Sequence, residues 1–146
     1  MHSSLNDLIT ANHGCCSKSK VASENGKRFE INCNEDFTRI KIDNSLITSQ
    51  QIEKCDFGFV RHSNDDFYFV ELKGKEIEKA YSQILNTIDY FNRNLIVIPK
   101  TKRFGFIVSS SVPKAGVNTN NLKQDFAKKH GRILEIKNKV LVHSPK

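Results

Sequence analysis

Two neighbouring stretches, EKCDFGFV at residues 53–60 and FYFVELKG at residues 67–74, decide which fold this sequence predicts. Both are rich in Phe and Val, which favour β-strands, and the polar tetrapeptide SNDD between them favours a turn. We therefore predict strands over 56–61 and 67–73 that pair antiparallel. An acidic residue begins the first strand, and the triplet ELK ends the second.

The placement of the charged residues in these strands indicates a metal site. Side chains alternate along a strand, so Glu71 and Lys73 point to one face while Val70 and Leu72 point to the opposite, buried face. The hairpin brings Asp56 alongside Glu71. Two adjacent carboxylates repel each other unless a cation lies between them, and hard oxygen ligands suit Mg²⁺ or Mn²⁺. The lysine is placed to orient or help deprotonate an attacking water.

At these residues the sequence resembles the PD-(D/E)XK nuclease superfamily, with Cys55 in place of the customary proline. The resemblance covers roughly residues 50 to 91. It implies that Asp56 and Glu71 bind the metal and that Lys73 is the catalytic lysine. It also implies an α/β fold, a restriction-endonuclease-like sandwich in which helices flank a mixed central β-sheet.

An amphipathic helix is predicted directly after the triplet, because apolar residues recur there at intervals of three and four. These residues are Ile77, Ala80, Tyr81, Ile84, Leu85, Ile88 and Phe91. Glu76, Lys79 and Gln83 form a polar stripe beside them. The core helix of the superfamily often presents a Gln or Lys to the site, which implies a catalytic role for Gln83 and a nucleic-acid contact for Lys79. Many members add an acid from the first helix, for which Glu24 and Glu30 are the candidates.

The rest of the chain is predicted to complete one domain over residues 1–146. The expected elements, in order, are a short helix within residues 3–20 of a less ordered segment 1–27, a hairpin over 29–33 and 37–42, buried strands at 95–98 and 104–109 or a loop entry followed by one strand, a short helix near 120–130, and a hairpin over 133–137 and 140–143.

The net charge is +7 and the sequence pI is about 9.3, which favours a polyanionic partner. Basic residues after position 99 are predicted to form a positive rim for a phosphate backbone. They are Lys100, Lys102, Arg103, Lys123, Lys128, Lys129 and Arg132, of which Lys102, Arg103, Lys128 and Lys129 are the main candidates. DNA is the expected partner. A homodimer is expected by analogy with small members of the superfamily.

Other patterns carry less chemistry. A second triplet, Glu135-Ile136-Lys137, follows no strand that opens with an acid at suitable spacing, so we interpret it as a solvated charge pair. The five histidines are scattered, and only His130 is suggested as a phosphate contact. No apolar run is long enough to cross a membrane and no signal peptide is evident, so a cytoplasmic protein is expected.

Three functions follow as hypotheses. The first is a metal-dependent endonuclease using Mg²⁺ or Mn²⁺. The second is a nuclease-like fold without catalysis that binds nucleic acid or a protein, in an accessory or immunity role. The third is a zinc-stabilised binding domain using Cys15 or Cys16 with His13 and Cys33, although the four cysteines follow no CxxC spacing.

Overall fold

The computed structural model describes residues 1–74, 76–110 and 119–146. Its elements, in chain order, are α1 (Leu5–Ala11), β1 (Cys16–Lys18), β2 (Val21–Glu24), β3 (Lys27–Ile31), β4 (Phe37–Lys41), β5 (Phe57–Arg61), β6 (Asp66–Gly74), α2 (Ile77–Tyr90), β7 (Arg103–Ser109), α3 (Thr119–Lys129), β8 (Ile133–Asn138) and β9 (Val140–His143). Short 3₁₀ turns cover His13–Cys15 and Lys100–Lys102, and a π-helical turn, Phe91–Leu95, extends α2.

A six-stranded mixed sheet in the order β1-β4-β5-β6-β7-β8 forms the centre of the fold. In this sheet β1, β4, β5 and β6 pair antiparallel, one with the next, while β6, β7 and β8 run parallel. The predicted pairing of β5 with β6 is confirmed, with Phe57 opposite Val70. The predicted helix α2 connects β6 to the parallel strand β7, and the predicted α/β class with a mixed sheet is confirmed.

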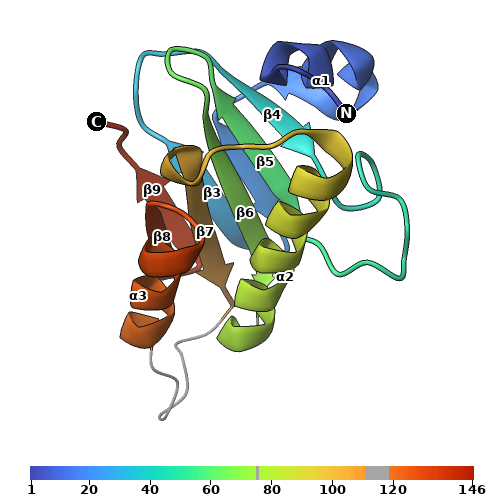
Figure 1. Cartoon of the computed structure of the whole chain (residues 1–146). Helices are drawn as coiled ribbons and strands as arrows, with labels where there is room; N and C mark the ends of the chain where they lie inside the picture. The colour runs from blue at the N-terminus through green and yellow to red at the C-terminus, as the bar shows by residue number, and fades with distance from the viewer. Residues whose placement is uncertain (75, 111–118) are drawn as a thin grey trace.

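Different layers cover the two faces of this sheet (Figure 1). Helices α1, α2 and α3 pack on one face, where Leu8, Ile84 and Phe126 share a core with Phe67 and Phe69 of β6. On the opposite face lies a three-stranded sheet, β2-β3-β9, and the core between the two sheets is rich in aromatic side chains. Within the described residues, helices therefore cover only one face of the large sheet, and the small sheet covers the face where a second helical layer was expected.

The predicted hairpins over 29–33 and 37–42 and over 133–137 and 140–143 are both wrong. Strand β3 pairs with β2 and β9 in the small sheet, while β4 pairs with β1 and β5 in the large one. Likewise β8 pairs with β7, and the chain crosses at Lys139 to the small sheet, where β9 runs parallel to β3. An alternating apolar pattern identifies a strand with one buried face, but it does not identify the partner strand.

Two other segments differ from expectation. Within the segment 1–27, expected to be less ordered, Cys16–Lys18 and Val21–Glu24 form β1 and β2, each of which occupies the edge of its sheet. The apolar segment 95–98 is not a strand, because it leaves the π-helical turn with Ile96 and Ile98 buried and Val97 62% exposed. The alternative of a loop entry followed by the single strand β7 is therefore the one observed. Among the described residues, no helix is long and apolar enough to span a bilayer.

Candidate active site

Asp56 is fixed at the point where β5 begins between β4 and β6. Its backbone N–H donates to the carbonyl of Val70 at 3.1 Å, and its own carbonyl accepts from the N–H groups of Ile42 and Asp43 at 3.0 and 3.3 Å. Its side chain continues the β5–β6 ladder, because Oδ2 accepts the backbone N–H of Leu72 at 2.8 Å. The residue is only 2% exposed. Backbone pairing thus directs this carboxylate toward the end of β6.

Glu71 lies in β6 next to that contact and is 1% exposed. Alternation assigns its side chain to the helix-covered face, because Phe67 and Phe69 belong to the helical core whereas Val70 and Leu72 belong to the core between the sheets. Asp56, whose Oδ2 accepts the N–H of Leu72, and Glu71 therefore lie at the same end of the β5–β6 pair.

The thiol of Cys55 lies close to both carboxylates. Complete burial raises the pKa of Cys55 well above its usual value, and the negative charge of Glu71 and then that of Asp56 raise it further. Two carboxylates acting on one buried thiol place a concentration of negative charge inside the protein. Such a charge is costly to bury unless cations or hydrogen bonds compensate it.

A hydrogen-bonded link ties this site to α2. The backbone N–H of Cys55 donates to Thr87 Oγ1 at 2.8 Å, and the Thr87 hydroxyl donates to the carbonyl of Gln83 at 2.7 Å. Thr87 is fully buried, and Gln83, one turn earlier, is half-buried. Lys79, a further turn toward the start of α2, is exposed. The residue before Asp56 is thus tied through Thr87 to the backbone of α2 at Gln83.

Lys73 belongs to β6 two residues after Glu71, and its side chain is outside the part of the chain that the structure describes. Neither candidate for the acid from the first helix lies in a helix, because Glu24 ends β2 and Glu30 lies in β3. The acid in α1 is Asp7, which accepts the Ser3 hydroxyl at 2.6 Å and is exposed. Glu30 forms an ion pair with Arg28 at 2.8 Å, and Glu24 ends β2 half-buried.

Asp43 is a further acid beside the site that was not predicted from sequence. It follows β4, its N–H donates to the Asp56 carbonyl, and its carboxylate lies 3.7 Å from Lys54 Nζ. The pairing of β4 with β5 was the missing signal, because it places the residues that end β4 beside those that begin β5.

The donor chemistry of Asp56 and Glu71 fits a hard divalent cation, since both supply carboxylate oxygens. Within residues 1–74, 76–110 and 119–146, however, no three His, Cys, Asp or Glu side chains are grouped so that they could hold a metal ion. This also applies to His13, Cys15, Cys16 and Cys33, so the described structure does not assemble the zinc site considered from sequence. The four cysteines are free thiols.

The four main basic candidates lie at the opposite end of the sheet from the acids. Arg103 is level with Phe67 in the β6–β7 register, whereas Glu71 is level with Ile107. Four residues of strand separate these positions, which corresponds to about 13 Å. Lys102 lies there too, 3.9 Å from Asp66. Lys128 and Lys129 end α3, where the Lys128 carbonyl accepts from Lys100 Nζ and Lys129 forms an ion pair with Asp125 at 3.1 Å.

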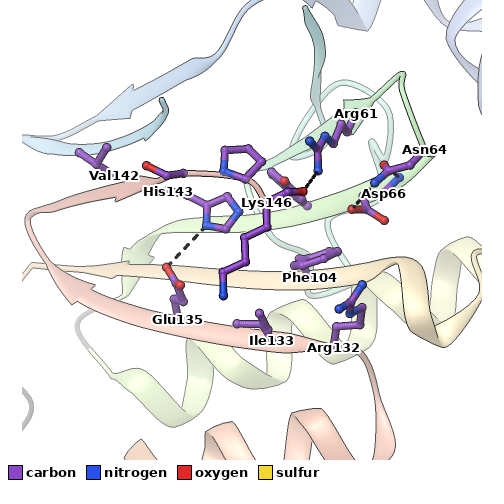
Figure 2. A pocket seen from close by; sticks show the side chains of 13 residues that line it. Arg61, Asn64, Asp66, Phe104, Arg132, Ile133, Glu135, Val142, His143 and Lys146 are labelled. Carbon is purple, nitrogen blue, oxygen red and sulfur yellow. Dashed lines mark hydrogen bonds and ion pairs between the residues drawn. The ribbon is translucent and has the colours of Figure 1, made fainter. Parts of the chain in front are cut away.

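The same distant end contains a cavity of about 330 Å³, shown in Figure 2. The Arg61 guanidinium donates to the Lys146 carbonyl at 3.0 Å, and His143 Nδ1 lies 4.0 Å from Glu135 Oε2. Burial lowers the pKa of His143. The wall therefore joins the C-terminal segment to β5 and β8, and the cavity is separate from the site at Asp56 and Glu71.

Comparison with known proteins gave no match to any protein family, curated protein or solved structure. Function must therefore be argued from the geometry of the chain itself.

Proposed function

We propose that this chain is a metal-dependent nuclease that hydrolyses phosphodiester bonds in nucleic acid, with DNA as the expected substrate. The observation that carries the proposal is the pair of almost fully buried carboxylates, Asp56 and Glu71, at one end of the β5–β6 pair. Carboxylate oxygens at one end of a sheet are the ligands that a hard divalent cation such as Mg²⁺ or Mn²⁺ prefers. The lysine two residues after Glu71 completes the acid-x-lysine order of the superfamily that the sequence resembles.

Each residue has a distinct role in this proposal. Asp56 and Glu71 would hold Mg²⁺ or Mn²⁺, which would supply Lewis-acid stabilisation of the charge that develops on the phosphodiester. Lys73 orients the attacking water and assists its deprotonation, and Gln83 helps to position it from α2. The water oxygen bonds to phosphorus while the bond to the leaving sugar oxygen breaks and that oxygen takes up a proton.

Basic side chains around the site would hold the phosphate backbone. Lys79 lies on the first turn of α2. Arg103 lies about 13 Å along the sheet from Glu71, with Lys102 beside it, and Lys128 and Lys129 end α3 near that end of the sheet. In this proposal the distant four contact only substrates long enough to extend past the helices. A homodimer remains an expectation from the superfamily.

Cleavage of plasmid and of single-stranded DNA in Mg²⁺, in Mn²⁺ and in EDTA tests the proposal. The wild-type protein is expected to cleave DNA in Mg²⁺ or Mn²⁺ but not in EDTA. The variants Lys73→Ala and Glu71→Gln are expected not to cleave it. The chain offers a matched control in its second Glu-x-Lys triplet, where Lys137 is exposed at the end of β8. Lys137→Ala should cleave normally. Cleavage that persists in EDTA, or that survives Lys73→Ala, would refute the assignment.

The second candidate is a nuclease-like module that binds nucleic acid or a protein without cutting. It is favoured by the finding that the described residues group two carboxylates and not three ligands, with one oxygen of Asp56 engaged by the backbone. DNA binding without cleavage in either metal would support this candidate over the first.

A further inference from the structure

A second cavity, of about 430 Å³, adjoins the candidate active site on the small-sheet side. The side chains of its wall that matter here are Arg39, Lys41, Phe57, Ser17, Ser23 and Ser45. Lys41 is level with Phe57 in the β4–β5 register, and Phe57 directly follows Asp56. The cavity therefore begins one residue from the first acid of the site.

The charged side chains that line this cavity, Arg39 and Lys41, are both positive. The Arg39 guanidinium lies 5.5 Å and the Lys41 ammonium 5.3 Å from the centre of the same ring, that of Phe57. None of the residues that line the cavity is acidic, and among the described residues no carboxylate forms an ion pair with either cation. Two like charges gathered over one ring repel each other, so an anion between them would be stabilised.

The hydrogen-bonding groups of the wall match the same ligand. Ser17, Ser23 and Ser45 each carry a hydroxyl that can donate, and Arg39 carries several N–H donors in a planar fork. One of them, on Nη1, is used by the carbonyl of Val21 at 2.8 Å, which fixes the guanidinium between the two sheets. A tetrahedral oxyanion accepts from several such donors at once, as a phosphate group does.

We propose that this cavity binds phosphodiester groups of a nucleic-acid strand that leaves the active site on the small-sheet side. The proposal rests on the nuclease function, and it assigns the path of the substrate. The strand passes from Lys79 on α2, over the end of the sheet at Asp56, into the cavity. Arg39 and Lys41 neutralise phosphates beside the one that is cut, whereas the basic group near Arg103 lies at the other end of the sheet.

Binding is measured by fluorescence anisotropy with a short labelled single-stranded oligodeoxynucleotide and its duplex, in EDTA, across a range of salt concentrations. The slope of log K against log salt is negative, and each phosphate contact removed should make it shallower by about 0.7 for a single strand. The corresponding loss of affinity is about fivefold near 0.1 M salt. Lys41→Gln should show this loss and Arg39→Gln/Lys41→Gln about 25-fold. Lys18→Gln is the matched control, because Lys18 lies on β1 and already pairs with exposed Asp36 at 3.2 Å.

Urea unfolding checks that Arg39→Gln is folded. If Arg39→Gln is unfolded, the proposal is tested with Lys41→Gln alone, because Lys41 is exposed. Loss of affinity in Lys41→Gln but not in Lys18→Gln supports the cavity, even if no cleavage is seen in Mg²⁺ or Mn²⁺. Equal binding by all variants, or no binding by the wild-type protein, overturns it. A polyglutamate peptide of equal charge that binds as tightly as the oligonucleotide would overturn the phosphodiester assignment.

Discussion

Replacing Thr87 with valine tests how the site is held together. Thr87 Oγ1 accepts the N–H of Cys55 and its hydrogen is donated to the carbonyl of Gln83, so one buried hydroxyl joins α2 to the residue before Asp56. Valine has nearly the same shape but cannot hydrogen-bond. The substitution therefore removes the link while the packing around residue 87 is maintained.

The magnitude follows from the buried N–H that is left without an acceptor. Such a group costs about 1–3 kcal/mol, which in a chain of this size lowers Tm by about 4–12 °C. The free energy of unfolding is measured by urea titration with an unchanged m value. Because Cys55 adjoins Asp56, cleavage by folded protein should also fall, by roughly tenfold or more if the carboxylate shifts.

Thr48→Val, at an exposed position, is the control and should unfold like wild type. If Thr87→Val unfolds within about 0.5 kcal/mol of wild type, the hydroxyl does not support the site and the reasoning is wrong.

Two further perturbations probe other contacts. Asp56→Ala removes the acceptor of a buried backbone N–H in β6 and should lower the free energy of unfolding, measured in urea, by about 1–3 kcal/mol. Asp56→Asn retains an acceptor oxygen and should lower it less. Equal losses in the two variants would contradict the role of Oδ2. Hydrogen bonds from Arg61 and then Ser63 lower the pKa of Glu35 to about 2, so its stabilising contribution is present above the unfolded pKa of about 4.3 and is lost as the pH falls toward 2. The urea midpoint of Glu35→Gln should therefore fall less than that of wild type between about pH 5 and pH 2.5, and parallel losses would exclude this contribution.

The central hairpin and α2 could be predicted because local patterns determine them. The strands β5 and β6 are buried on both faces and read as nearly continuous apolar runs, and α2 buries one regular stripe. The same hairpin register places Asp56 and Glu71 at one end of the β5–β6 pair. These features require no knowledge of distant residues.

The small sheet could not be predicted in this way. Its strands alternate buried and exposed side chains, as any strand with one face in water does. In β9, Leu141 is buried while Val140 and Val142 are about half exposed. The short loops that follow β3 and β8 suggested hairpins, but the chain changes sheet at both points. The cavity at Arg39 and Lys41 depends on this layer, since Ser23 of β2 forms part of its wall, and so it could not be foreseen either.

The pairing of β3 with β9 has a consequence for biosynthesis. Arg28 aligns with Val140, so the partner strand of β3 leaves the ribosome more than a hundred residues after β3 itself. Until then the aromatic surface around Phe29 lacks its parallel neighbour, and an unpaired strand edge can associate with other chains. A nascent chain arrested before residue 140 should therefore expose this surface to chaperones, whereas a chain that includes β9 covers it.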